Sequence, residues 1–457
     1  MTATVDIPIW LLVLILLFAG IAALDRVLGP TVRWFLRRRM ERVVAELNKR
    51  LERPIQPFKL ARRHDMIQRL IYDPKVAEAV AMHTRETGLR EDVAFEEARR
   101  YAREIVPSFS ASAYFGFAIR AARWLSTRLY DVRLETVDEA ALAAIDHDAT
   151  VVFVINHRSN MDYVLVTYLA AERSALSYAV GEWARVWPLS RLIRAMGAYF
   201  IRRKSRNALY RRVLARYVQL STSAGVTQAI FPEGGLSVDG RVAPPRMGLL
   251  SYIVAGFDPR ARDVVFVPVA LNYDRVIEDR VLVAAARSGD RRFRGSFLTG
   301  ARFAARWLWR RVTGQARRFG VAAVSFGAPL SMKAIRDETP QAGPTTVADM
   351  LMARIAAQVP VTPVPLMAAA LAETGTPVMA EDLLARARTL LPPGVTRPED
   401  LEGALRMLKL RHILVDGPDG ITIRPGQEAV VEYYAASVEH LIRPRRIASE
   451  PAATAES

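Results

Sequence analysis

The chain has 457 residues, of which 51% are hydrophobic and 24% charged, enough apolar sequence to bury a large core in two or three packed units and to exclude wholesale disorder. Its formal net charge of +17 implies an anionic partner: nucleic acid, an anionic membrane surface or phosphate-bearing substrates. It has no cysteine, which excludes disulfides, thiolate zinc sites and a cysteine nucleophile.

The first structural signal is an uncharged run near the N-terminus. It extends from Ile7 to Leu24 and lies between Asp6 and Asp25. At 1.5 Å per residue, a helix of this length spans about 27 Å, close to the thickness of a bilayer core. We predict a transmembrane or membrane-anchor helix within residues 1–28; a buried core helix is the alternative reading.

Basic residues follow this run. They are Arg26, Arg33, Arg37, Arg38, Arg39, Arg42, Lys49 and Arg50. Because positively charged flanks stay in the cytoplasm, we expect the protein at the cell inner (cytoplasmic) membrane, with the rest of the chain on the cytoplasmic side. The same charges can contact anionic membrane lipids.

The next segment, residues 29–130, is predicted to be a basic helical region. Helical spacing runs over residues 61–103, with Pro74 and Gly88 as interruptions. Residues 109–129 are aromatic and apolar, also at helical spacing. We therefore expect a layer of helices whose aromatic side chains are packing residues.

Residues 131–340 change to short β-rich apolar runs, each followed by a helical stretch. The runs are Thr150–Ile155, Leu176–Val180, Gln228–Phe231, Val264–Ala270 and Val321–Phe326. Strands that alternate with helices predict an α/β domain with a mainly parallel sheet flanked by helices. In such sheets, ligands bind beyond the carboxyl ends of the strands, and the polar motifs of this chain lie there.

A second basic block, residues 287–318, interleaves arginine with tryptophan and phenylalanine at helical spacing. This pattern suits an amphipathic helix at a lipid interface. It suits equally a solvated basic helix that packs its aromatic side chains on the domain, and the sequence leaves both readings open.

Residues 341–445 are predicted to form a small C-terminal helical domain. The expected elements are helices within 345–395, over 399–410 and over 427–442, and a hairpin over 412–423 that would allow a winged arrangement. The last residues, 446–457, are small and polar and are expected to be a disordered tail.

The strand expected at Thr150–Ile155 runs directly into a polar loop that contains His157 and Asp162. A helix that begins between these two residues would let the carboxylate meet one ring nitrogen and leave the other facing a cleft. A histidine held in this way is a general base, which an alcohol needs to attack a thioester at neutral pH. The spacing alone is also compatible with a surface histidine and an N-capping aspartate.

Adjacent cations follow the apolar segment 197–201. They are Arg202, Arg203 and Lys204. A strand that ends in this way can deliver guanidinium groups to a phosphate. A strand that ends in a solvated charge cluster is the simpler alternative.

Two further strand ends carry polar motifs. Residues 231–241 read F-P-E-G-G-L-S-V-D-G-R, in which the glycines permit a tight turn and Arg241 could meet a phosphate. Residues 267–274 read V-P-V-A-L-N-Y-D, which predicts a buried strand that leads to polar residues. Taken singly, the first motif is compatible with an ordinary turn and the second with sheet core.

In this order and spacing, the four motifs resemble those of the glycerolipid acyltransferase superfamily, which are N-H-x4-D, G-x-x-F-I-R-R, F-P-E-G with trailing Ser and Arg, and V-P-V. The surrounding sequence is most similar to the bacterial membrane-bound glycerol-3-phosphate acyltransferases. Residues 157–163 are close to that family's H-R-S-H-M-D-Y, and residues 433–441 resemble its Y-Y-x-N-x-x-x-H-L tail.

The resemblance implies a glycerol-3-phosphate 1-O-acyltransferase of phospholipid synthesis, which passes an acyl group directly from acyl-CoA or acyl-carrier protein to the sn-1 hydroxyl of glycerol 3-phosphate. It implies His157 as the general base and Asp162 as its orienting carboxylate. It further assigns the acceptor phosphate to Arg202, Arg203 and Arg241, the acceptor site to Glu233, Gly234, Gly235 and Ser237, and the acyl-donor side to Pro268. No cofactor and no metal are expected.

One departure from the family pattern concerns the acceptor. Where the family reads E-G-G-R-S-R-T-G-R, this chain has Leu236 and Val238 in place of two arginines and Asp239 in place of the threonine. A hydrogen bond to a charged group is worth about 1.5–3 kcal/mol, so this loss weakens phosphate binding unless Arg246, Arg206 or Lys204 substitutes.

Two other functions remain open at this point. One is acylation of lysophosphatidate or another lysolipid, although the extra N-terminal and C-terminal regions favour the larger glycerol-3-phosphate enzymes. The other is a non-catalytic, membrane-bound lipid or nucleic-acid binder. Against nucleic acid as a partner, no expected helix has an obvious base-reading face, and a binder has no need for both His157 and Asp162.

Overall fold

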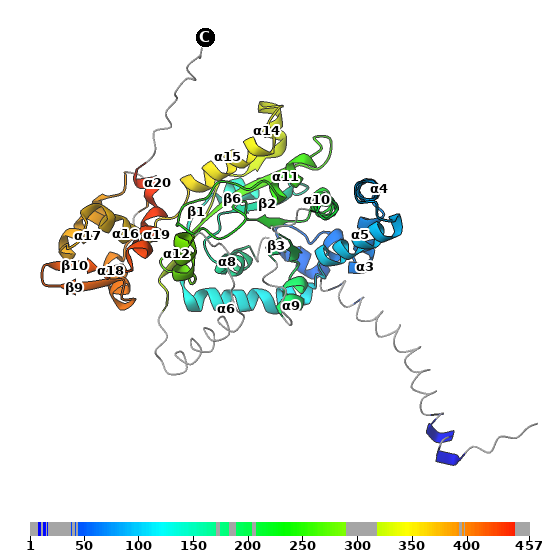
Figure 1. Cartoon of the computed structure of the whole chain (residues 1–457), viewed down its shortest axis with the longest axis horizontal. Helices are drawn as coiled ribbons and strands as arrows, with labels where there is room; N and C mark the ends of the chain where they lie inside the picture. The colour runs from blue at the N-terminus through cyan, green and yellow to red at the C-terminus, as the bar shows by residue number, and fades with distance from the viewer. Residues whose placement is uncertain are drawn as a thin grey trace, which may run out of the picture. The chain divides into compact units, whose positions relative to one another are not determined.

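The computed structural model describes the chain in several stretches (Figure 1): residues 8–10, 12–14, 16, 38, 42, 44–170, 174–181, 189–202, 207–288, 318–392, 395–396 and 398–443. The chain divides into two units. One unit comprises Met1–Ile55 with Glu172–Ser174, and the other comprises Gln56–Ala171 with Ala175–Ser457. The second unit contains the whole sheet and is described below.

Several predicted segments fall largely outside the described stretches. They are the uncharged run Ile7–Leu24, the basic block 287–318 and the tail 446–457. No helix that the structure describes combines the length and the apolar character needed to cross a membrane.

The core of the second unit is one eight-stranded sheet. Its strands are β1 (Asp131–Val137), β2 (Thr150–Ile155), β3 (Ser177–Gly181), β4 (Tyr199–Ile201), β5 (Gln228–Ile230), β6 (Val264–Tyr273), β7 (Val321–Phe326) and β8 (Leu330–Ser331). The spatial order is β1-β7-β6-β2-β5-β3-β4, and β8 pairs with β6. The pairs from β6 through β2, β5 and β3 to β4 are all parallel, which confirms the predicted mainly parallel sheet.

The central strands read as continuous apolar runs because both of their faces are covered. All residues of β2, β6 and β7 are buried. The edge strand β1, Asp131–Val137, instead alternates polar and apolar residues and is only partly buried, so it gave no strand signal of the same kind. The strand β7 runs antiparallel to β6 and parallel to β1, a reversal that the runs themselves could not reveal.

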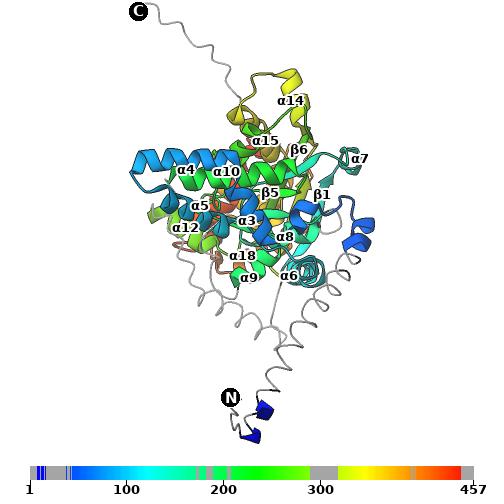
Figure 2. The ribbon, with the colours of Figure 1, turned by 90° about the vertical axis from the view of Figure 1, so that its right-hand side faces the viewer.

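One face of the sheet is covered by a helical layer (Figure 2). Its helices are α3 (Arg63–Ile71), α4 (Pro74–Thr87), α5 (Glu91–Ile105), α10 (Ala208–Ser223), α11 (Leu249–Ala255) and α15 (Pro344–Ala357). The predicted interruptions are helix ends: Pro74 is the first residue of α4, where Asp73 caps the Lys75 N–H, and Gly88 ends this helix with φ +69°.

The opposite face packs against α6 (Ile119–Leu129), α8 (Met161–Leu169) and the C-terminal helices. The latter are α16 (Pro363–Thr374), α17 (Ala380–Thr389), α18 (Leu401–Leu410), α19 (Glu428–Ala436) and α20 (Glu439–Ile442), with the antiparallel hairpin β9 (Leu414–Gly417) and β10 (Gly420–Ile423). Nine consecutive residues of α16 are buried, because α17, α18 and α19 all pack around it. The helices and the hairpin of this region lie within the predicted ranges, except that the helix expected over 427–442 is divided into α19 and α20 at Ser437 and Val438. The helix α15, which was expected in the same region, packs on the sheet.

The remaining elements connect these layers. They are α2 (Pro57–Leu60), the π-helix η1 (Ser112–Ala118), α7 (Glu139–Ala143), α9 (Leu189–Ala195), α12 (Asp279–Ser288) and α14 (Met332–Glu338). Because β2, β4, β5 and β6 share one direction, the segments that follow them emerge at the same edge of the sheet. These segments hold the polar residues of the first three sequence motifs, whereas the fourth motif lies in β6 itself up to Tyr273, with Asp274 directly after the strand.

Candidate active site

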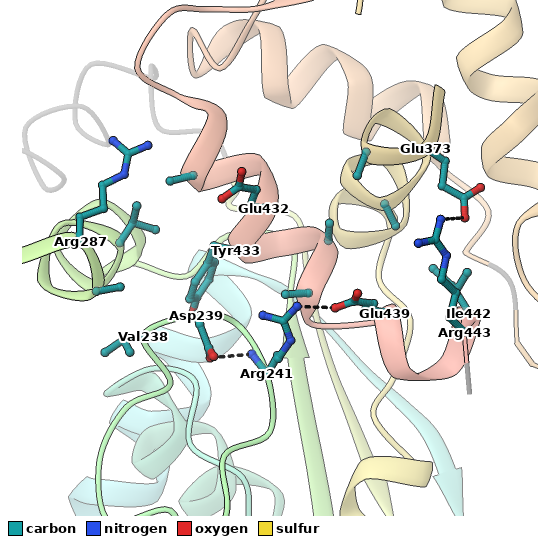
Figure 3. A pocket seen from close by; sticks show the side chains of 17 residues that line it. Val238, Asp239, Arg241, Arg287, Glu373, Glu432, Tyr433, Glu439, Ile442 and Arg443 are labelled. Carbon is teal, nitrogen blue, oxygen red and sulfur yellow. Dashed lines mark hydrogen bonds and ion pairs between the residues drawn. The ribbon is translucent and has the colours of Figure 1, made fainter. Parts of the chain in front are cut away.

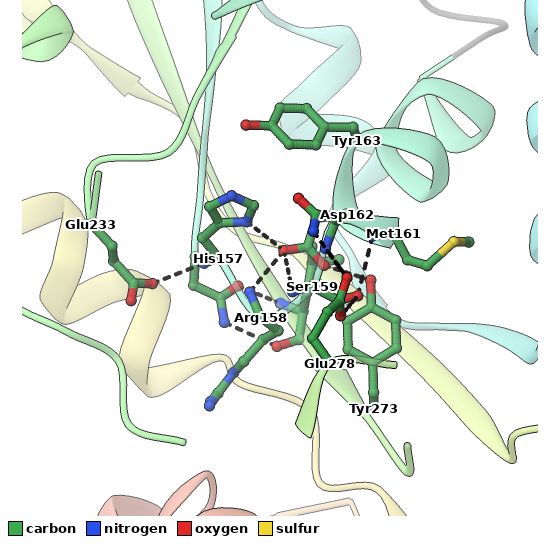
Figure 4. Close-up of polar contacts among 12 residues, drawn as sticks. His157, Arg158, Ser159, Met161, Asp162, Tyr163, Glu233, Tyr273 and Glu278 are labelled. Atoms are coloured by element: carbon green, nitrogen blue, oxygen red, sulfur yellow. Dashed lines mark hydrogen bonds and ion pairs between the residues drawn. The ribbon is translucent and has the colours of Figure 1, made fainter. Parts of the chain in front are cut away.

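His157 and Asp162 lie together at the carboxyl end of β2 (Figure 4). The strand ends at Ile155, and α8 begins at Met161, so Asp162 is in the first turn of the helix. Its Oδ2 atom lies 2.9 Å from His157 Nδ1, and the two side chains are 0% and 2% exposed. The loop therefore folds so that the carboxylate meets one ring nitrogen.

The Asp162 carboxylate is held from four directions. Besides His157 Nδ1, its Oδ2 accepts the backbone N–H of Arg158 at 2.7 Å and that of Ser159 at 3.0 Å. Its Oδ1 accepts the Tyr273 hydroxyl at 2.7 Å. The carboxylate also lies in the first turn of α8, at the positive end of the helix. Because Oδ2 already accepts two backbone N–H groups, it also acts as an acceptor toward His157, which places a proton on Nδ1 and leaves the Nε2 lone pair available to take a proton.

Aromatic rings enclose the imidazole of His157. The Phe231 ring lies 4.3 Å from it between centroids, and the Tyr163 ring meets it edge-on at 5.4 Å. Within the described part of the chain, Nε2 has no hydrogen-bond partner. Since the ring is 2% exposed, a substrate hydroxyl reaches Nε2 only when a covering side chain moves aside. The reacting atoms would then be shielded from water.

Glu233 fixes the backbone behind the histidine. Its two oxygens accept the N–H of His157 at 2.9 Å and that of Ala243 at 3.1 Å. Burial raises the pKa of Glu233 to about 7, although these hydrogen bonds and the nearby Arg158 oppose the shift. The predicted acceptor-site residue thus joins the third motif to the first.

The rest of the third motif forms a tight loop. Gly234 has φ +67°, and a Cβ there would lie 2.9 Å from the Arg246 side chain, which is why only glycine suits this position. The Ser237 N–H donates to the His157 carbonyl at 2.9 Å, and its hydroxyl donates to the Arg241 carbonyl at 2.7 Å. Gly235 is half-buried in the same turn. These contacts place the predicted acceptor-site residues beside His157, mainly through backbone hydrogen bonds.

The predicted phosphate ligands have different surroundings. Arg202 forms a two-point ion pair with Glu104, at 2.8 and 2.7 Å, and its guanidinium lies over the rings of Tyr101 and Tyr210. Arg203 lies outside the described residues. Leu236 and Val238, which replace family arginines, are half-buried and pack against the hydrophobic core.

Arg241 lies on the wall of a cavity of about 460 Å³ between the third motif and the C-terminal helices (Figure 3). Its Nη2 atom lies 2.5 Å from Glu439 Oε2 on α20. Both side chains are about half exposed, so water screens this pair and a competing anion can separate it. Of the three predicted phosphate ligands, the two that the structure describes are therefore paired with carboxylates.

Pro268, predicted on the acyl-donor side, is buried within β6. It pairs with Val154 of β2, and its carbonyl accepts the Gly327 N–H at 2.8 Å. On its other side, β6 pairs with β8 up to Phe266 and with β7 from Val269. The proline, which has no N–H, thus occupies the changeover between two partner strands.

Three residues of the site had no predicted role. Tyr273 bonds Asp162, as above, and Glu278 accepts the Ser159 hydroxyl at 2.8 Å and the Asn160 amide at 3.0 Å. Burial raises the pKa of Glu278. Both residues lie at or just after the carboxyl end of β6, the parallel neighbour of β2, and that position is the signal that could have identified them.

The third is Arg158, which is 2% exposed and points away from His157 toward the C-terminal helices (Figure 4). Its Nη2 atom donates to the Ser437 carbonyl at 3.5 Å, and its Nε and Nη1 have no hydrogen-bond partner in the described stretches. The same stretches contain no group of three histidine or acidic side chains that could hold a metal ion.

Comparison with known proteins identifies the domain that carries this site. Residues 134–272 match the family model described as Acyltransferase. The chain is 28% identical to a glycerol-3-phosphate acyltransferase of Pseudomonas aeruginosa, over 85% of this chain and 50% of that one. It is 28% identical to one of Ectopseudomonas mendocina, over 61% and 33%, and 26% identical to one of Pseudomonas putida, over 84% and 49%.

The chain thus spans between a third and half the length of these relatives. Among solved structures, a 1-acyl-sn-glycerophosphate acyltransferase from Thermotoga maritima is 19% identical, with a TM-score of 0.31 over 57% of this chain and 83% of that one. The match of the family model and the similarity to these enzymes, together with the four motifs at one edge of the sheet, show that this chain carries an acyltransferase domain and resembles the glycerol-3-phosphate acyltransferases.

Proposed function

We propose that this protein transfers an acyl group from a pantetheine thioester, acyl-CoA or acyl-carrier protein, to the sn-1 hydroxyl of glycerol 3-phosphate. The observation that carries the proposal is the buried pair of His157 and Asp162 at the carboxyl end of β2. The names of the relatives, which are glycerol-3-phosphate acyltransferases, support the choice of acceptor.

In the proposed reaction, His157 Nε2 takes the proton of the acceptor hydroxyl while the oxygen attacks the thioester carbonyl carbon. The Asp162 carboxylate stabilises the imidazolium that forms. The tetrahedral intermediate then collapses, the carbon–sulfur bond breaks, and the departing thiolate receives the proton from Nε2. The acyl group passes directly from donor to acceptor, and the histidine ends in its initial protonation state.

The acceptor phosphate would bind beside this pair, at the loop of the third motif. Arg241 is the candidate ligand there, because a phosphate can displace the half-exposed Glu439 carboxylate from it. Arg203 remains a proposed ligand. Arg202 would have to break its ion pair with Glu104 to bind the phosphate, so we propose that it contributes less to phosphate binding than the other two arginines.

The test is release of free thiol from acyl-CoA by the full-length protein in detergent micelles or membranes, with and without glycerol 3-phosphate. His157→Ala should abolish the acceptor-dependent rate, because no described residue can replace the base. His83→Gln is a matched control, since His83 also bonds a carboxylate, Glu97 at 3.2 Å, but lies in the helical layer. Full activity in H157A would contradict the proposal.

A second acceptor class remains under consideration because Leu236 and Val238 occupy the positions of two family arginines. The same assay should therefore compare glycerol 3-phosphate with 1-acylglycerol 3-phosphate and dihydroxyacetone phosphate. A kcat/KM that is highest for the lysolipid would change the acceptor and keep the reaction. Turnover with none of the three would remove the proposed activity altogether.

We further propose that the uncharged run Ile7–Leu24 anchors the protein at the cytoplasmic membrane, with the acyltransferase domain on the cytoplasmic side and its basic flank on anionic lipids. Membranes from expressing cells should retain the protein after an alkaline carbonate wash. A variant that lacks residues 1–28 should be released, and retention of this variant would refute the anchor.

A further inference from the structure

The strand that carries the fourth motif ends at Tyr273, whose hydroxyl donates to Asp162 Oδ1 at 2.7 Å. The two side chains are 1% and 0% exposed. We propose that Tyr273 is a positioning residue of the acyl transfer, which acts on His157 through Asp162. The proposal rests on the proposed function and adds a residue to it.

The hydrogen bonds of Asp162 show why this contact matters. All three donors from its own loop, His157 Nδ1 and the N–H groups of Arg158 and Ser159, converge on Oδ2. In the described stretches, the Tyr273 hydroxyl is the one partner of Oδ1. Without it, a carboxylate oxygen would lie buried and unpaired, which is unfavourable in a site closed to water.

The structure also fixes where the tyrosine hydroxyl lies. The Asn156 side chain clamps the loop after β2 to β6, because its amide donates to the Leu271 carbonyl at 3.0 Å and its oxygen accepts the Leu271 N–H at 2.7 Å. Two residues later, Tyr273 is on the same face of the strand. Its ring packs against that of Tyr130 at 5.3 Å, which limits its rotation.

By donating a hydrogen bond, the Tyr273 hydroxyl stabilises negative charge on the Asp162 carboxylate. Burial and the Asp162 charge hold the pKa of Tyr273 well above its ordinary value, so the hydroxyl remains a donor at every working pH. A carboxylate with one fewer donor is a stronger base and a less well-oriented one. Without the Tyr273 hydroxyl, the Asp162 carboxylate should therefore stabilise the imidazolium more strongly and move the His157 titration to higher pH.

Other charged and titratable groups lie around the same pair, and their effects must be separated from this one. They are Glu233 after β5, Glu278 after β6, Tyr163 of α8 and Tyr130 after α6, together with the Arg158 guanidinium, which points away from His157 but lies near Glu233. Glu233 is the most important, because burial raises its pKa to about 7. An acidic limb in the rate alone could belong to it, so the imidazole must be observed directly.

The experiment compares Tyr273→Phe with Tyr130→Phe in the full-length protein. Tyr130 is a matched control because it is 1% exposed, packs on Tyr273 and donates its hydroxyl to the Arg275 carbonyl at 2.7 Å, but makes no bond to Asp162. Each variant loses one buried hydroxyl. The measurements are kcat, KM for glycerol 3-phosphate, the thermal midpoint and the histidine ring titration by NMR, assigned with His157→Gln.

Y273F should lower kcat about 10- to 100-fold, change KM less than about twofold, and shift the His157 titration upward by several tenths of a pH unit. Y130F should lose comparable thermal stability without either change. The inference is overturned if Y273F leaves both the rate and the titration as in wild type, or if Y130F reproduces them. The NMR titration needs no turnover, so it tests Tyr273 even if the proposed activity proves wrong.

Discussion

Replacement of Asp162 by asparagine separates the two proposed tasks of this carboxylate, which are to orient His157 and to stabilise its imidazolium, because the change removes the charge and keeps the shape of the side chain. Three N–H donors point at Oδ2, from His157, Arg158 and Ser159. The amide oxygen must therefore take the Oδ2 position, since an NH2 group there would face three donors at once. The NH2 group then occupies the Oδ1 position, where the Tyr273 hydroxyl can rotate to accept from it.

In this orientation D162N still accepts the His157 Nδ1–H, so the productive tautomer is retained. What is lost is the difference between a charged and a neutral hydrogen bond, roughly 1–2 kcal/mol, plus part of the attraction to the imidazolium. We expect kcat to fall about 10- to 100-fold. A flipped amide would force the wrong tautomer, for which losses of about 10⁴-fold are known in other enzymes.

The assay is initial-rate thiol release at saturating acyl-CoA and glycerol 3-phosphate, with thermal unfolding to show that the variant is folded. Asp162→Ala is the companion variant: it leaves the same three donors unpaired in a dry site and should lose both activity and stability. A D162N rate equal to wild type would refute charge stabilisation by Asp162. A loss near 10⁴-fold in a fully folded protein would refute the argument that the backbone donors hold the amide in place.

Three further predictions concern residues around the pair. Because the pKa of Glu233 is raised to about 7 in the folded protein, its ionisation opposes folding, so the stabilising effect of its protonated form should be lost as pH rises from about 4.5 through about 7. Glu233→Gln should flatten that part of the profile of thermal midpoint against pH, and an unchanged slope would contradict the assignment. Glu439→Gln should lower KM for glycerol 3-phosphate about two- to fivefold with kcat unchanged, because the carboxylate that competes with the phosphate for Arg241 is removed. Glu432→Gln, on the wall of the same cavity, is the control. An equal change in KM for both variants would refute the competition. Gly240→Ala should destabilise the fold by about 2–4 kcal/mol, since φ is +83° and a Cβ would lie 1.8 Å from the Tyr433 carbonyl oxygen. Gly343→Ala is the control, because a Cβ at Gly343 would meet no atom within 4 Å. Equal thermal midpoints for the two variants would refute the steric argument.

Much of the architecture could be predicted because its signals are local. The strands β2 and β7 begin and end where their apolar runs do, and Pro74 and Gly88 delimit α4 by backbone rules that hold in any protein. The reversal of β7 could not be predicted, since an apolar run has no direction. The helical spacing of α15 identifies an apolar face but not its packing partner, so it gave no sign that the helix packs on the sheet rather than with the C-terminal helices.

The site divides in the same way. His157 and Asp162 are five residues apart, so one loop and one helix start determine their contact. Tyr273 is 111 residues from Asp162, and its hydrogen bond to that carboxylate depends on β6 lying beside β2 in a particular register. Arg202 was assigned to phosphate from its neighbours in sequence, but its ion pair is with Glu104, 98 residues away, which no local pattern could indicate.

The short stretch from Tyr433 to Glu439 has a consequence for engineering. Within it, the Ser437 carbonyl accepts from Arg158, the residue after His157, the Ser437 hydroxyl accepts from Asn272 of the fourth motif, and Glu439 pairs with Arg241 of the third motif. The C-terminal helices therefore cannot be exchanged independently of the acyltransferase domain. A chimera that takes them from a relative should be inactive unless the third-motif loop is exchanged with them, because the contacts between the loop and the helices depend on residues of both.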